Sequence, residues 1–131
     1  MNAVKLLNVG KTINGETILK NVNITIKQGE IVGFEGRNGS GKSVLFKMIA
    51  GIMIPTAGKI EVLDEELKKG KFPRDIGVSL DNTGFMPSLS AFDNLKTIAD
   101  IRGIIDSNEI RKYIELVGLN PESKKRSVSF L

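Results

Sequence analysis

Residues 36–43 of the chain read Gly36-Arg37-Asn38-Gly39-Ser40-Gly41-Lys42-Ser43. Glycine permits a positive φ and a close backbone approach, so successive backbone N–H groups of such a loop can point into one concavity. The spacing fits G-x-x-x-x-G-K-[ST], a pattern in which the loop, the lysine and the hydroxyl hold phosphate groups. The stretch therefore predicts a binding site for a polyphosphate.

The residues on either side have the context that this pattern requires. Residues 30–34, Glu-Ile-Val-Gly-Phe, are mostly apolar without alternation, which is typical of a strand buried on both faces of a parallel sheet. Apolar residues then predict a helix from about Gly41 to Ala50, with Gly51 as its C-terminal stop. A buried strand, a glycine-rich loop and a helix in this order indicate a nucleotide-binding loop.

Each part of this loop has a chemical role. Backbone N–H groups and the positive end of the following helix would stabilise the α- and β-phosphates. Lys42 would place a mobile charge on the β- and γ-phosphates. The Ser43 hydroxyl would bind Mg²⁺, a hard ion that prefers oxygen ligands.

The N-terminal segment predicts an antiparallel hairpin. Its strands are Val4–Val9 and Thr17–Ile26, and Asn14-Gly15 forms the turn, since this dipeptide between apolar segments is a strong hairpin signal. Further strands are predicted at Lys59–Leu63 and Asp75–Leu80.

The last third of the chain predicts two helices. Ser90 and Asp93 form a capping box that opens the first helix, which runs to about Arg102. The second begins at Asp106 or Ser107 and stops at Gly118. The expected buried positions are Phe92, Leu95, Ile98 and Ile101 in the first helix, and Ile110, Tyr113, Ile114 and Val117 in the second.

The composition excludes several kinds of chemistry. The 131 residues include no His and no Cys, which excludes Ser-His-Asp and Cys-His nucleophiles, zinc sites and disulfides from this chain. The net charge of +4 lies entirely in residues 1–63, which hold eight basic and four acidic residues. An anionic ligand or an ordinary basic surface would each explain that excess. The longest apolar stretch, Val44–Ile54, is too short to span a bilayer, and the N-terminus lacks a signal-peptide pattern.

Longer stretches of the sequence point to one family. The segments ILKNVNITIKQGEIVGFEGRNGSGKS, IAGIMIPTAGKIEV and IGVSLDNTGFMPSLSAFDNL resemble the nucleotide-binding domain of ABC transporters, in particular ATPases of antibiotic and multidrug exporters of the bacitracin type. The resemblance implies an α/β fold: a P-loop NTPase core with an N-terminal antiparallel β-subdomain and the start of a helical subdomain. Residues 1–131 would form part of such a domain, with the β-subdomain and P-loop core at about 1–80 and the Q-loop region and helical subdomain at about 81–131.

The resemblance also implies site residues. ATP would be bound by Gly36, Arg37, Asn38, Gly39, Ser40, Gly41, Lys42, Ser43 and Val44, with Mg²⁺ on Ser43. Ile13 stands where the family has an aromatic residue that stacks on adenine, and Ile offers no π-face. Asp81 stands at or near the Q-loop glutamine. It would hold a Mg²⁺-bound water or, alternatively, turn the loop together with Asn82.

Three further family motifs are expected beyond Leu131: the signature loop, the strand ending in Asp-Glu (Walker B) and the switch His. The segment Ile60–Glu65 imitates that strand, but it follows the P-loop helix too soon, and we assign it to an intervening strand and turn. Phosphoryl transfer needs a metal-holding carboxylate and a water-positioning group besides the phosphate loop. The complete protein is therefore expected to be an ATPase, and this chain alone to bind nucleotide with negligible hydrolysis.

The resemblance implies partners and a location. A transmembrane permease subunit and a second nucleotide-binding subunit are expected, with the protein cytoplasmic and peripheral at the inner face of the cell membrane. Nucleic acid is not expected, because the basic run Lys124-Lys125-Arg126 lacks interleaved aromatic residues. Two alternatives stay open: a soluble ABC-type ATPase without a membrane partner, and a nucleotide-binding short form without activity. Without the family's flanking strands, Ile31, Val32 and Phe34 would be exposed.

Overall fold

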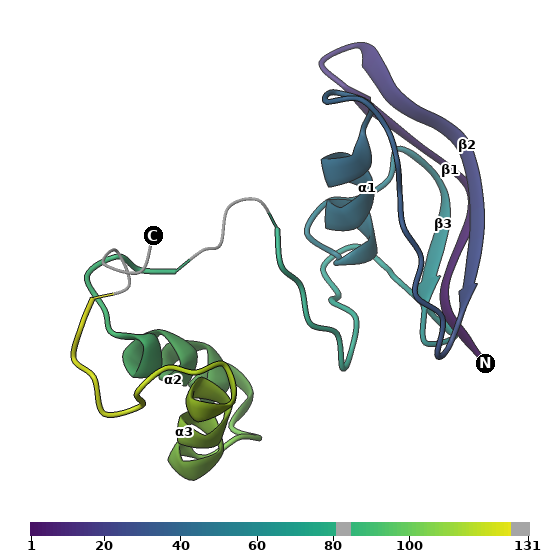
Figure 1. The fold of residues 1–131 in the computed structure, drawn as a ribbon. Coiled ribbons are helices and arrows are strands. Elements are labelled where there is room, and N and C mark those ends of the chain that lie inside the picture. The colour runs from purple at the N-terminus through teal and green to yellow at the C-terminus, as the bar shows by residue number, and fades with distance from the viewer. Residues whose placement is uncertain (81–84, 127–131) are drawn as a thin grey trace. The chain divides into compact units, whose positions relative to one another are not determined.

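The computed structural model describes residues 1–80 and 85–126, and Asp81 lies outside these ranges (Figure 1). The chain divides into two compact units, Met1–Leu80 and Asp81–Leu131. The first unit holds a sheet and one helix, and the described part of the second holds two helices. The longest described helix has 12 residues, and none in the described ranges has the length and hydropathy of a membrane span.

The sheet of the first unit is antiparallel throughout. Its strands are β1 (Asn2–Ile13), β2 (Glu16–Lys27), β3 (Ala57–Val62) and β4 (Glu65–Glu66), in the order β2-β1-β3-β4. Asn14 and Gly15 connect β1 to β2 with φ values of 50° and 78°, as a tight hairpin turn with two left-handed residues requires. The predicted hairpin is confirmed, with longer strands than the sequence indicated.

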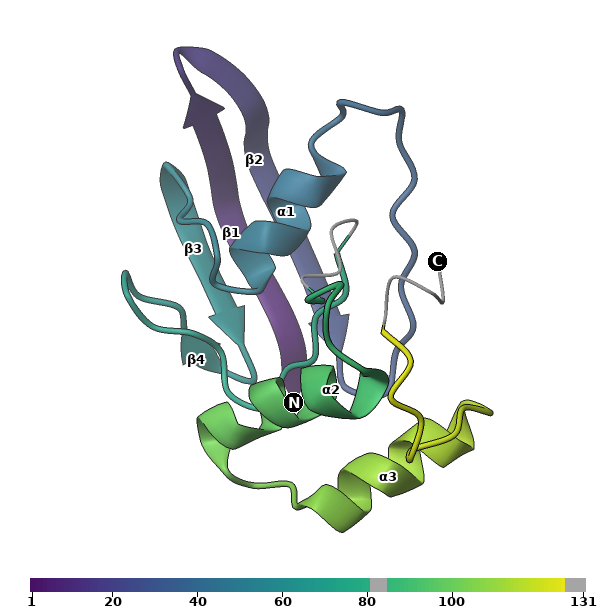
Figure 2. The same ribbon diagram turned by 90° about the vertical axis from the view of Figure 1, so that its left-hand side faces the viewer.

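Helix α1 (Lys42–Ile49) lies across one face of this sheet (Figure 2). The helix prediction is confirmed, including the stop at Gly51, whose N–H donates to the Met48 carbonyl at 3.1 Å. The core between helix and sheet consists of Leu6, Val9, Leu45, Met48, Ile60 and Val62. Burying each of these side chains contributes about 1.5–3 kcal/mol, so this packing fixes where α1 begins relative to the strands.

Two predicted strands are wrong. Residues 30–34 and 75–80 form no strand; Ile31 is fully exposed, and Val32 and Val78 are nearly half exposed. An apolar parallel strand needs partners on both sides, and every described strand pair belongs to the antiparallel sheet. The expected exposure of Ile31 and Val32 is confirmed. Phe34 instead is partly buried and meets Phe46 edge-on, with ring centroids 5.4 Å apart.

The second unit contains α2 (Ala91–Arg102) and α3 (Ser107–Leu116). The predicted cap at Ser90 is confirmed, since its hydroxyl accepts the Asp93 N–H at 3.1 Å. The second helix begins at Ser107, one of its two predicted starts, and the Asp106 carboxylate caps it by accepting the Glu109 N–H at 2.9 Å. Both helices also end as predicted, at Gly103 with φ 65° and near Gly118 with φ 83°.

The predicted apolar stripes are only partly right. Ile110 and Ile114 are buried, whereas Ile98, Ile101, Tyr113 and Val117 are exposed. A pair of helices buries only the seam between them, so residues at the edges of each stripe stay in solvent. The buried residue of α2 is instead a polar one, Asn94.

Candidate functional site

The glycine-rich loop lies at the beginning of α1. After β2, residues 28–40 run as an extended arm back to the end of the sheet where the β1–β2 turn lies (Figures 1 and 2). A turn then forms over residues 37–40, in which the Ser40 N–H donates to the Arg37 carbonyl at 3.0 Å. Gly39 inside this turn has a φ of 83°, which explains why a glycine stands there.

Gly41 holds the loop against the sheet. Its φ is 96°, and a Cβ at this position would lie 2.8 Å from Leu19 Cδ2 and 3.2 Å from Ile18 Cγ2. Glycine is therefore favoured for its backbone conformation, and a larger residue would also have to displace the Leu19 and Ile18 side chains. The motif did not point to Ile18 and Leu19 as the floor under the loop. The signal for them is the adjacent apolar pair, which interrupts the alternation of β2.

The first turn of α1 is open to an anion. The first N–H groups of a helix have no acceptor within the helix, and Leu45 is the first residue of α1 whose N–H reaches one, the Gly41 carbonyl, at 2.9 Å. The cap residue, Gly41, has no side chain that could accept a hydrogen bond from these N–H groups, and the first turn carries no acidic side chain. Free N–H groups and the positive end of the helix dipole together favour a phosphate.

The Lys42 ammonium lies at this same place. It donates to the Gly36 carbonyl, so its charge is held over the loop that it closes. Ser43 is exposed beside it. The structure thus brings together the loop backbone, an ammonium group and a hydroxyl, a set that fits the phosphates of a nucleotide and one ligand position of Mg²⁺.

Two other predicted residues contribute differently. Val44 is partly buried and packs against the core, so its backbone N–H is the group left for a ligand. Ile13 is half-buried at the end of β1, paired with Glu16 beside the hairpin turn. The hairpin turn and the glycine-rich loop lie at the same end of the sheet (Figures 1 and 2).

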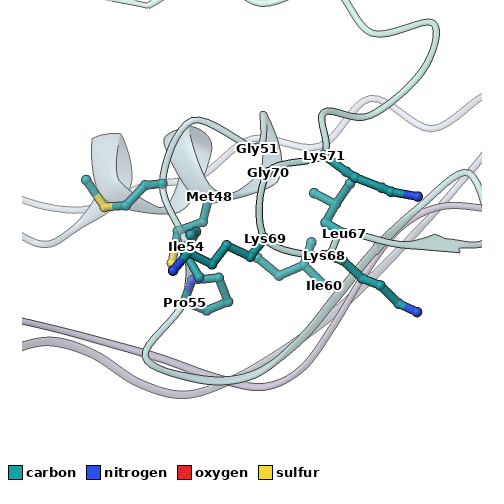
Figure 3. Close-up of a pocket in the computed structure, with 11 residues that line it drawn as sticks. Met48, Gly51, Ile54, Pro55, Ile60, Leu67, Lys68, Lys69, Gly70 and Lys71 are labelled. Atoms are coloured by element: carbon teal, nitrogen blue, oxygen red, sulfur yellow. The ribbon is translucent and has the colours of Figure 1, made fainter.

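Two cavities of the first unit lie away from the glycine-rich loop. One of about 20 Å³ lies between the end of α1, Ile60 of β3 and residues 67–71 (Figure 3). Lys69 reaches across it toward Ile54, whereas Lys68 and Lys71 point away (Figure 3). A cavity of about 360 Å³ is lined by Met1, Gln28, Phe72 and their neighbours. Neither includes a residue of the glycine-rich loop.

Comparison with known proteins identifies relatives of this chain. A family model described as "ABC transporter" matches residues 19–130. The chain is 38% identical over 117 residues to an uncharacterized ABC transporter ATP-binding protein, YybJ, of Bacillus subtilis (strain 168), covering 88% of this chain and 54% of that protein. It is 39% identical over 124 residues to the bacitracin transport ATP-binding protein BcrA of Bacillus licheniformis, covering 93% and 40%.

A solved structure matches as well. The ATP-binding cassette MJ0796, as a dimer in a post-hydrolysis state bound to ADP and Pi, aligns with a TM-score of 0.74 and 29% identity. The alignment covers 95% of this chain and 62% of that one. The chain therefore spans between two fifths and about three fifths of the length of these relatives.

Proposed function

Because the chain belongs to the family of ABC transporter ATP-binding domains, we propose that its glycine-rich loop, residues 36–43, binds the phosphates of Mg-ATP to drive transport. The observation that supports this most is the open first turn of α1, with the Lys42 ammonium held beside it. Free N–H groups and the positive end of the helix dipole at such a helix beginning favour the binding of a highly charged anion.

Different groups of the loop would bind different parts of Mg-ATP. The N–H groups of Lys42, Ser43 and Val44 would donate to phosphate oxygens, and Gly41 lets the backbone approach them. The Gly36 carbonyl already positions the Lys42 ammonium, so little rearrangement is needed for it to bind the β- and γ-phosphates. Mg²⁺ would neutralise phosphate charge when bound, with the Ser43 hydroxyl as a ligand and Asp81 as a further one through water.

The base would lie toward the β1–β2 turn. We propose that Ile13 packs against adenine there, through apolar contact alone, because an aliphatic side chain has no π-face to stack on a base. Selectivity for adenine over other bases is then expected to be low.

We propose that the whole protein is the ATP-binding subunit of an exporter and lies at the inner face of the cell membrane. It would assemble there with a permease subunit and a second nucleotide-binding subunit. The similarity to BcrA supports transport, and the dimeric state of MJ0796 supports pairing. By resemblance, residues 81–94 would face the permease.

Hydrolysis is proposed to need more than this chain. Phosphoryl transfer requires a metal-holding carboxylate and a group that positions water, besides the loop that holds the phosphates. Phosphate release by the 131-residue chain is expected to equal that of its Lys42→Ala variant, and a clear excess over the variant would refute this part.

Calorimetric titration with Mg-ATP tests the proposed site. Lys42→Ala is expected to weaken binding by about tenfold to a hundredfold, because one charge-assisted hydrogen bond contributes about 1.5–3 kcal/mol. Lys20→Ala is the matched control, since it removes the same charge from an exposed position on β2. Equal affinities of the Lys42→Ala variant and the unmodified chain would rule out the loop as the phosphate site.

A further inference from the structure

Asn94 is the buried polar side chain of α2, with 5% of its surface exposed. Its Oδ1 accepts the Met86 N–H at 2.8 Å, and its Nδ2 donates to the Met86 carbonyl at 3.1 Å. These are the two hydrogen bonds that a neighbouring strand would make with Met86. A single side chain therefore replaces a strand partner for the segment before α2.

The same side-chain amide also contacts the backbone of residues 89 and 90. Nδ2 also lies 3.3 Å from the Leu89 carbonyl and 3.1 Å from the Ser90 carbonyl, and the Leu89 N–H donates to the Met86 carbonyl at 3.1 Å. Buried amide groups must be satisfied, and such networks fix one conformation. Residues 85–90 are thus folded around the Asn94 side chain.

This segment presents apolar side chains on the surface. Phe85 is 47% exposed and Met86 is 51% exposed. Residues 82–92 contain no charged side chain, although 26% of the chain is charged. Phe and Met are enriched, and charges depleted, at the centres of protein interfaces. The composition fits a partner surface that is itself uncharged and apolar.

We propose that Asn94 is a positioning residue: it joins residues 85–90 to α2 as one rigid body and so holds Phe85 and Met86 in place for the partner. The identity of that partner, an apolar segment of a membrane subunit, rests on the proposed function. The positioning itself is a property of this chain. Force applied to Phe85 or Met86 is then passed directly to α2.

Amide hydrogen exchange of the full chain tests this inference. In Asn94→Ala, protection of the Met86 amide is expected to fall by about tenfold or more, while the amides of residues 95–102 keep theirs. Asn108→Ala, at an exposed asparagine of α3, is the matched control and should leave Met86 unchanged. Unchanged exchange at Met86 in Asn94→Ala would overturn the proposal, and so would an equal loss of protection throughout α2.

Asn94→Asp provides a test that does not depend on removing the side chain. One carboxyl oxygen still accepts the Met86 N–H, and the other faces the carbonyls of Met86, Leu89 and Ser90. A protonated carboxyl can donate to one of them, whereas an ionised one is repelled, so the pKa of the new carboxyl is raised. Protection of Met86 is expected at low pH and should fall as pH rises through that pKa. A pH-independent protection factor would contradict the proposal.

Nucleotide titration separates this inference from the proposed function. Asn94→Ala should bind Mg-ATP as the unmodified chain does, because the glycine-rich loop belongs to the other unit. Lys42→Ala should leave Met86 exchange unchanged. Absence of ATP binding in the unmodified chain would refute the proposed function alone, and Met86 exchange that follows the Lys42 variant instead of the Asn94 variant would refute the positioning role alone.

Discussion

Gly41 shows how one residue joins the fold to the candidate site. It caps α1, adopts a φ of 96° and lies against Leu19 and Ile18 of β2. The motif predicts a glycine here for its backbone conformation. The motif does not predict the contact with β2, because that contact depends on where the sheet packs against the loop. The motif thus predicts which residues would bind phosphate, and the residues that support the loop are found only from the adjacent apolar pair in β2.

Replacing Gly41 by Ala is expected to destabilise the first unit by about 2 kcal/mol, somewhat more than a strained φ alone, because the Leu19 and Ile18 side chains must also shift to admit the methyl group. Gly39→Ala is the matched control: its φ is 83°, but no atom lies within 4 Å of the added Cβ. The control should cost only about 1–2 kcal/mol. Chemical denaturation measures both, and equal losses would show that the contact with β2 contributes nothing.

At the scale of elements, local signals were reliable and long-range pairing was not. The Ser90 cap, the start of the second helix, the Asn14-Gly15 turn and the ends of the helices depend on neighbouring residues, and the structure has them where the sequence predicts them. The strands predicted at residues 30–34 and 75–80 depend on distant partners, and neither forms. An apolar run indicates that a segment can pair, but it does not supply the partner.

The pairing of β1 with β3 depends on a close approach at Gly58. This residue has a φ of 82°, and an added Cβ would overlap the carbonyl oxygens of Leu7 and Asn8. We expect Gly58→Ala to cost about 3 kcal/mol or more, because backbone atoms cannot move aside as a flexible side chain can.

Gly29→Ala serves as the comparison for Gly58→Ala. Gly29 also has a positive φ, 85°, but its surroundings are open. The Gly29→Ala substitution should lower the free energy of unfolding by about 1 kcal/mol, from the backbone conformation alone. If urea midpoints of the two variants coincide, the close packing of β1 on β3 is wrong.

At the scale of the whole molecule, apolar surface is left exposed in both units. In the first unit it includes Ile31, Val32, Ile76 and Val78, and in the second Ile98, Ile101 and Leu116. Exposed apolar residues on extended, unpaired backbone favour association with another chain. The exposure of residues 31 and 32 was expected from the family resemblance.

We therefore expect the chain to self-associate as its concentration rises. Ile31→Lys should reduce this association without lowering the free energy of unfolding, because the side chain is fully exposed. Thr17→Lys, which adds the same charge at an exposed polar position of β2, should have a smaller effect. Sedimentation velocity measures the distribution of species, and a monomer at every concentration in the unmodified chain would be evidence against this expectation.

The central claim is that residues 36–43 bind the phosphates of a nucleotide, and a titration followed residue by residue tests it most directly. On addition of Mg-ATP, backbone amide resonances of residues 39–44 are expected to shift most, because their N–H groups would donate to phosphate oxygens. Inorganic triphosphate should shift the same amides, and adenosine should not. Saturating Mg-ATP that leaves these amides unshifted, or shifts mainly amides of the helical unit, would contradict the account.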